Sequence, residues 1–151
     1  ENWGISMLPK WHIFWGVLFT AIIWFFAKDL EPIYLLLIFL STFLIDFDHY
    51  LVAVRKNESL SFKRSLIFFK ENNKKELSDH KKGKKNKGHF FLFHTMEFHM
   101  FVALLSLVWA GFFYVFIGMV FHSLLDLLWL LYHNMFYVRE FFLFNWLIKK
   151  F

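Results

Sequence analysis

Ten ionisable side chains interrupt the apolar segments of this sequence, and they are of the types that bind divalent cations or transfer protons. They are His12, Asp46, Asp48, His49, His89, His94, Glu97, His99, His122 and Asp126. An ionisable group inside a membrane-spanning segment is costly unless it pairs with another group, faces a polar cavity or binds a metal. Each of these residues therefore requires a physical reason for its position.

Two pairs have spacings that place both side chains on one face of a helix. His122 and Asp126 are four residues apart, and His94 and Glu97 are three apart, so the members of each pair can reach a common point. Histidine and carboxylate ligands without cysteine suit zinc, with Mn²⁺ or Mg²⁺ as alternatives. More than four candidates predict either two ions or one ion with a second layer of supporting groups.

The composition indicates a membrane protein. Of 151 residues, 58% are apolar, 24% are aromatic and only 19% are charged. A water-soluble fold of this size has too small an interior to bury so much apolar surface. The same figures exclude disorder, collagen and a coiled coil. The absence of cysteine excludes a disulfide framework, a thiolate zinc site and a cysteine nucleophile.

Four apolar segments have the length of a membrane span, because about twenty helical residues cross the hydrocarbon core. They are residues 12–28, 33–54, 89–110 and 112–133, with the turn between the last two at Gly111. We therefore expect one all-α domain, a polytopic membrane protein with four transmembrane helices. Residues 60–69 and 135–151 mix apolar and cationic side chains, which predicts interfacial amphipathic helices. Residues 71–88 are polar and include KKGKKNKG, which predicts a flexible, solvated loop.

The distribution of charge predicts the orientation of these spans. The net charge is +5, and residues 55–88 hold twelve of the seventeen Lys and Arg residues. Four spans place this basic loop on the same side as Lys10, Arg139, Lys149 and Lys150, which leaves only Lys28 on the other side. The positive-inside rule assigns the basic side to the cytoplasm. We therefore expect an integral protein of the cell (inner) membrane with both termini in the cytoplasm.

This topology gathers most of the ionisable residues at one depth. The first and third spans begin on the cytoplasmic side, and the second and fourth end there. The residues at these four ends are His12; Asp46, Asp48 and His49; His89 and His94; and His122 and Asp126. We therefore predict a divalent-cation site near the inner leaflet, where a metal-bound water of lowered pKa is the natural nucleophile.

Four motifs contain these residues. They are His12–Gly16 (H-x-x-x-G), Ile45–His49 (I-D-x-D-H), His89–Thr95 (H-x-x-x-x-H-T) and Gly118–Asp126 (G-x-x-x-H-x-x-x-D). In this order they resemble the YdjM-like membrane-bound metal-dependent hydrolases, a family distantly similar to the helical fold of zinc phospholipase C and nuclease. The second motif has isoleucine in place of the family's proline. The third keeps both histidines of H-R-G-x-T-H-S but lacks its Arg, Gly and Thr.

The resemblance covers about residues 12–126 and implies a metal-dependent hydrolase. The ligands that it implies are His12, Asp46, Asp48 or His49, His89, His94, His122 and Asp126. We assign the general base to Glu97 or Asp48. A site at headgroup depth under a basic loop favours a phosphoester of a lipid or another amphiphile as the substrate. The expected partners are membrane lipids, with anionic headgroups held by the Lys-rich loop; nucleic acid is not expected, because the charge adjoins the spans.

Structural explanations compete with these roles. His12 or His89 can be an interfacial or loop residue, Asp48 and His49 can be solvated, and the His122–Asp126 pair can be a polar link between helices. Glu97 can also be a ligand or the partner that fixes an imidazole tautomer. Two other functions remain open: a metal transporter or sensor, which predicts ligands across the whole membrane, and a non-catalytic adaptor with a partner-binding basic loop, which predicts no bound metal.

Overall fold

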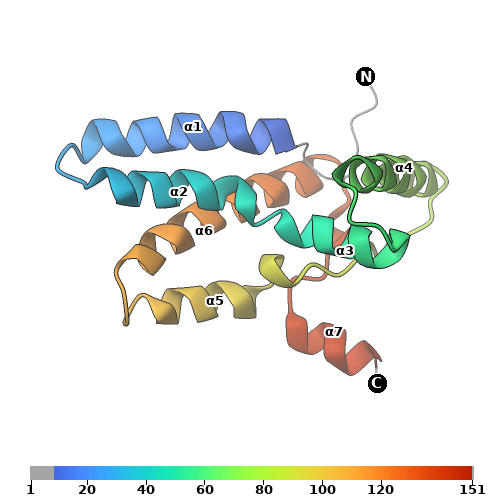
Figure 1. Ribbon diagram of the computed structural model, residues 1–151. Helices are drawn as coiled ribbons and strands as arrows, with labels where there is room; N and C mark the ends of the chain where they lie inside the picture. The colour runs from blue at the N-terminus through green and yellow to red at the C-terminus, as the bar shows by residue number, and fades with distance from the viewer. Residues whose placement is uncertain (1–8, 151) are drawn as a thin grey trace.

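The computed structural model describes residues 9–150, and this part of the chain is helical without strands (Figure 1), which confirms the all-α prediction. Residue 151, at the end of the predicted 135–151 helix, lies outside the described residues. The helices are α1 (Pro9–Phe26), α2 (Pro32–Leu44), α3 (Phe47–Asn57), α4 (Phe62–Lys81), the 3₁₀ turn η1 (Leu92–His94), α5 (Met96–Leu105), α6 (Gly111–Tyr132), the 3₁₀ turn η2 (Phe136–Val138) and α7 (Leu143–Lys150).

Helix α2 is at the centre of the arrangement. It packs against α1 and, most extensively, against α6, while α5 packs against α6. Helices α3 and α4 contact each other and lie beyond the end of the α1–α2 pair at which α1 begins, as Figure 1 shows. The α1–α2 and α5–α6 turns lie at the opposite end. The polar helix α4 is therefore separated from these two turns by the length of the bundle.

The structure supports fewer complete spans than the sequence predicted. Within residues 9–150, two helical segments are long and apolar enough to cross a membrane: Pro32–Asn57, which comprises α2 and α3, and Gly111–Tyr132. The apolar part of α1, Lys10–Phe26, is shorter. The third predicted span, 89–110, contains only the ten-residue α5, which is about 15 Å long and covers half of a ~30 Å hydrocarbon core. Helix α5 begins late because Thr95 is its N-cap, with the side-chain oxygen accepting from the N–H of Phe98.

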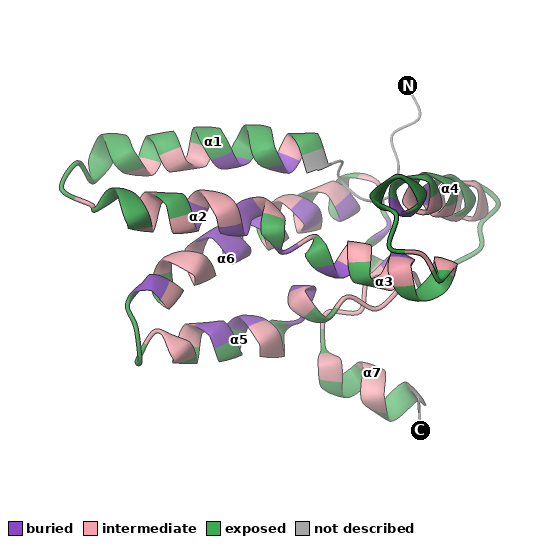
Figure 2. Cartoon of the chain, viewed as in Figure 1, coloured by how far each residue is buried: buried purple, intermediate pink, exposed green. Residues whose placement is uncertain are grey.

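Buried residues lie where the helices face one another (Figure 2). Several of them are polar, whereas many large apolar side chains are exposed. His12, Thr42, Thr95 and His122 are among the most deeply buried side chains, at 0–1% exposure. Outward-facing aromatic residues include Phe26, which is 81% exposed. Exposed apolar surface on this scale is unusual for a small water-soluble domain.

The prediction of a flexible loop at 71–88 is wrong for residues 71–81, which continue α4. The inner face of α4 is anchored: Leu77 packs against the buried cluster of Leu130, Met135 and Val138, and His80 Nδ1 lies 2.9 Å from the Tyr137 hydroxyl. These contacts stabilise the helix, although the lysine-rich sequence of its outer face does not by itself predict one.

The C-terminal helix is also shorter than predicted, because residues 139–142 run extended beside residues 88–96. The N–H of Gly88 donates to the carbonyl oxygen of Val138 at 2.9 Å, and the N–H of Met96 donates to that of Phe141 at 2.9 Å. Asn134 has a positive φ of 55°, a left-handed conformation that prevents α6 from continuing. This pairing fixes the position of Arg139.

Candidate metal centre

Four side chains from three parts of the chain bring one potential ligand atom each to a common point. Asp46 lies at the junction of α2 and α3, His94 ends η1, and His122 and Asp126 lie on successive turns of α6. The two Nε2 atoms of His94 and His122 are 3.1 Å apart. Asp46 Oδ1 is 3.6 and 3.5 Å from these two atoms, and Asp126 Oδ2 is 3.7 and 3.5 Å from them. The predicted convergence of distant segments is therefore present.

Hydrogen bonds at the far side of each ring fix which nitrogen carries the proton. His122 Nδ1 is 2.7 Å from the carbonyl oxygen of Thr42, which can only accept. His94 Nδ1 is 3.0 Å from Asp48 Oδ2, a carboxylate oxygen that also accepts from the N–H of Phe93. Both Nδ1 atoms must donate, so in neutral rings both Nε2 atoms have a lone pair. Two lone pairs and two carboxylate oxygens then face one another, an arrangement that a cation relieves.

The cluster could therefore hold a metal ion, and the described residues include three overlapping groups of the right composition. They are His12, Asp46 and His122; Asp46, His49 and His94; and His94, His122 and Asp126. The distances between ligand atoms suit a small divalent ion, because metal–ligand bonds of about 2.0–2.1 Å place tetrahedral ligand atoms about 3.3 Å apart. The carboxylate–imidazole and carbonyl–imidazole contacts are the outer partners that such sites use to orient histidine.

His12, on α1, is a fifth candidate ligand beside the four converging side chains. Its Nε2 atom is 3.3 Å from Asp126 Oδ1, and its ring stacks on that of His122 with centroids 3.9 Å apart. Its Nδ1 atom is buried and has no hydrogen-bond partner. Burying an imidazole that has an unsatisfied nitrogen is costly. The favourable contacts of His12 with Asp126 and His122 account for its position at the polar centre, and it is not an interfacial residue.

Two glycines bring the helices close enough to form this centre. A Cβ atom at Gly118 would lie 2.4 Å from the carbonyl oxygen of Ile38, and one at Gly16 would lie 2.2 Å from Thr42 Oγ1. Both partners are on α2. Each glycine is four residues from a histidine of the centre, so the glycine contact and the imidazole share one helical face. This explains physically the H-x-x-x-G and G-x-x-x-H spacings.

Arg139 is a member of the site that the sequence analysis used only as a topological charge. It donates a hydrogen bond from Nη1 to Asp126 Oδ2, and its guanidinium lies 5.9 Å from the ring centroid of Phe91. This arginine reaches the site from the segment beyond α6. No spacing rule could identify it, because the extended pairing of 139–142 with 88–96 positions it.

Asp48 and His49 lie beside the four converging atoms. Asp48 Oδ1 accepts from His49 Nδ1 at 2.9 Å, and Asp48 Oδ2 accepts from His94 Nδ1. His49 Nδ1 is also 3.4 Å from Asp46 Oδ1. Asp48 is thus placed to orient His94, and both of its oxygens have hydrogen-bond donors, which leaves little capacity for the general-base role suggested from the sequence.

Glu97, the other predicted general base, is directed away from the cluster. Its carboxylate accepts from the N–H groups of Leu143 at 2.9 Å and Phe144 at 3.3 Å, the first residues of α7. A carboxylate at a helix N-terminus satisfies unpaired N–H groups and complements the helix dipole. The structure thus gives Glu97 a structural role as the cap of α7.

This role gives a first prediction. Replacing Glu97 by alanine should loosen α7 at a cost of about 1 kcal/mol and leave metal content unchanged. Trypsin cleavage after Lys149 or Arg139 and hydrogen exchange of the α7 amides should both become faster. A loss of bound metal in Glu97→Ala would contradict the capping role and restore Glu97 to the centre.

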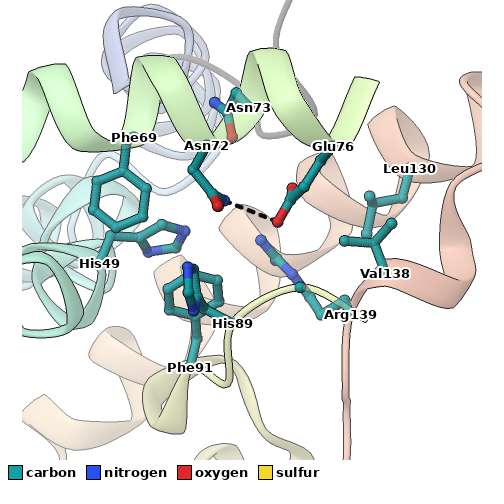
Figure 3. A pocket seen from close by; sticks show the side chains of 11 residues that line it. His49, Phe69, Asn72, Asn73, Glu76, His89, Phe91, Leu130, Val138 and Arg139 are labelled. Carbon is teal, nitrogen blue, oxygen red and sulfur yellow. Dashed lines mark hydrogen bonds between the residues drawn. The ribbon is translucent and has the colours of Figure 1, made fainter. Parts of the chain in front are cut away.

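Two other histidines of the sequence set lie outside the cluster. His99 Nδ1 is 2.9 Å from the carbonyl oxygen of Thr95, and its Nε2 is 3.0 Å from Ser123 Oγ. His99 is therefore a packed histidine between α5 and α6. His89 lies with its ring 5.7 Å from that of Phe68 and lines a cavity under α4 (Figure 3). Neither belongs to the described groups that could hold a metal.

Comparison of the chain with family models, with curated proteins and with solved structures found no match.

Proposed function

We propose that this chain is a membrane-embedded metal-dependent hydrolase whose centre is formed by Asp46, His94, His122 and Asp126, with His12 beside them. One observation carries the proposal: the Nε2 atoms of His94 and His122 lie 3.1 Å apart, and each is 3.5–3.7 Å from a carboxylate oxygen of Asp46 and of Asp126. The hydrogen bonds of the two Nδ1 atoms fix the tautomers of both imidazoles. With neutral rings, the two Nε2 lone pairs and the Asp46 oxygen face one another without a donor between them, an arrangement that a bound cation would relieve.

Zinc is the metal that the ligand set favours. Two imidazoles and two carboxylates without a thiolate are compatible with zinc and, less selectively, with Mn²⁺ or Mg²⁺. The resemblance to the YdjM-like hydrolases supports the same inference, because His12, Asp46, Asp48, His94, His122 and Asp126 all occupy motif positions. His89 also occupies one, but its place beside Phe68 gives it no direct support as a ligand.

The chemistry follows from the surroundings of the centre. A divalent ion bound there would lower the pKa of a water molecule and stabilise negative charge on the substrate. Asp48 and the Thr42 carbonyl hold the two imidazoles in the tautomer that ligation requires. Arg139 adds a cation next to Asp126. A guanidinium beside the reacting group suits a phosphoester, whose oxygens take bidentate hydrogen bonds.

The location of the centre supports a lipid or another amphiphile as the substrate. Its residues lie where α2 meets α3 and along the second half of α6, toward the end of the bundle that carries the basic helix α4 (Figure 1). Placed by the positive-inside rule, this end faces the cytoplasm, and the lysines of α4 would lie among anionic headgroups. The inner membrane is the location that follows.

Metal content and hydrolysis test this function together. Protein purified in detergent without chelator should contain about one zinc ion per chain. It should cleave mixed phospholipids to an alcohol and a phosphate monoester, and bis(4-nitrophenyl) phosphate to 4-nitrophenol and 4-nitrophenyl phosphate. Chelator should remove the activity, and zinc or Mn²⁺ should restore it. Metal without turnover on any phosphoester would favour a transporter or sensor, and absence of metal would favour the adaptor.

A further inference from the structure

A small cavity borders the candidate metal centre on the side of α4 (Figure 3). Its volume is about 30 Å³, which is enough for one or two water molecules or for a single polar substituent. Asn72, Asn73 and Glu76 of α4 line one side, and His49 and Arg139 line the other. The α4 residues are the polar inner face of a helix whose outer face is lysine-rich.

Two of the lining residues also contact the centre. Arg139 donates to Asp126 Oδ2, and His49 Nδ1 lies 3.4 Å from Asp46 Oδ1. A group in the cavity is therefore separated from the ligand carboxylates by one side chain. For a phosphoester held at the centre, this small cavity could take only the leaving oxygen and the atoms next to it.

Glu76 is the carboxyl group of this cavity. Its Oε1 accepts from Asn72 Nδ2 at 2.8 Å, and Figure 3 shows the carboxyl group directed toward the Arg139 guanidinium. Burial raises the pKa of Glu76 above its ordinary value, although the Asn72 hydrogen bond and Arg139 oppose the effect. His49 and His89 also line the cavity, and the charges of Lys75 and Asp79 act on Glu76 from α4 itself.

The other carboxylates near the centre are committed to other contacts. Glu97 caps α7, and both oxygens of Asp48 accept hydrogen bonds. Asp46 and Asp126 belong to the converging group of ligand atoms. A phosphoester with an alkyl leaving group needs a proton donor, because an alkoxide leaves poorly, and Glu76 is the acid on the leaving-group side.

We propose that Glu76 is the general acid of the reaction, an inference that rests on the proposed hydrolase function. In the step, the bond from water oxygen to phosphorus forms and the phosphorus–oxygen bond to the alcohol breaks. The leaving oxygen takes the proton of the Glu76 carboxyl group. The attacking water releases one proton to solvent, and the Glu76 carboxylate regains one from solvent.

Leaving-group dependence tests this role. Glu76→Gln should slow hydrolysis of an alkyl phosphodiester by about 10²–10⁴-fold, but it should change hydrolysis of bis(4-nitrophenyl) phosphate by less than about threefold, because nitrophenolate leaves without a proton. An acid must be protonated, so the wild-type rate on the alkyl substrate should fall as pH rises through the Glu76 pKa, and this limb should be absent in the variant. Glu71→Gln, an exposed change on the same helix, is the matched control.

A binding measurement separates this inference from the proposed function. Calorimetry of inorganic phosphate binding to the zinc-loaded protein, run in two buffers of different ionisation enthalpy, counts the protons taken up. Wild type and Glu71→Gln should take up more protons than Glu76→Gln, because the bound anion raises the pKa of an acid that faces it. If wild type cleaves phosphoesters but Glu76→Gln matches it on alkyl substrates, the general acid is wrong and the function stands. If wild type cleaves no phosphoester, the proposed hydrolase function is wrong. If wild type and Glu76→Gln take up the same number of protons, or if phosphate does not bind, the placement of Glu76 against a phosphoryl group is wrong.

Discussion

Replacing His122 by alanine is expected to weaken zinc binding by more than about 100-fold. Loss of an outer partner of a metal ligand already costs about 10–100-fold, and His122 Nε2 is within 3.5 Å of His94, Asp46 and Asp126. Its removal deletes one ligand of the cation that would offset the negative charges of the two carboxylates. Zinc content after chelator-free purification and a competition titration with a zinc-binding dye would measure the effect.

His99→Ala is the matched control for this prediction. His99 is also a buried histidine facing α6, with hydrogen bonds to Thr95 and Ser123 instead of the centre. Its replacement should lower the melting temperature and leave zinc affinity within about threefold of wild type. Asp48→Asn should give an intermediate loss, about 10–100-fold, because it weakens the orientation of His94 without removing a converging atom. Equal zinc content in all three variants would exclude the centre.

Replacing Gly118 by alanine should destabilise the fold, although helix propensity alone predicts the opposite. Alanine in a helix is favoured over glycine by about 1 kcal/mol, but the added Cβ would lie 2.4 Å from the carbonyl oxygen of Ile38. A backbone oxygen cannot rotate away, so α6 must separate from α2. Overpacking of this kind costs about 1–3 kcal/mol, and small residues are what allow membrane helices to approach closely.

The thermal melting of the detergent-solubilised protein, followed by tryptophan fluorescence, measures this effect, and zinc affinity should fall with stability because His122 is on the same helix. Gly16→Ala provides a comparison: its nearest contact is the Thr42 hydroxyl, a side-chain atom, so we expect a smaller loss. A melting temperature for Gly118→Ala at or above that of wild type would show that α2 and α6 are not in close contact at this point.

The shortfall in spanning helices illustrates a limit of hydropathy. Residues 89–110 are apolar enough to suggest a complete span, yet the chain enters η1 at Leu92 and begins α5 only after Thr95. Because His94 lies in the η1 turn before α5, its side chain is directed toward His122. Composition counts apolar residues and carries no information about where a helix begins, which here is set by the Thr95 cap. Nor does composition predict α4, whose inner face packs against residues 130–138.

The sequence by itself determined the all-α class, the apolar exterior and the metal-binding character of the side chains. These properties follow from residue type and spacing, since His122 and Asp126 share a face wherever their helix packs. Only the tertiary structure decided which candidates meet. Asp46 and His94 join His122, whereas Glu97 caps α7 and His99 packs beside Ser123. Membership in the centre depends on helix separation, set at Gly16 and Gly118, and on the extended pairing that brings Arg139 to Asp126. Such contacts join residues on different elements of the fold, and no local pattern encodes them.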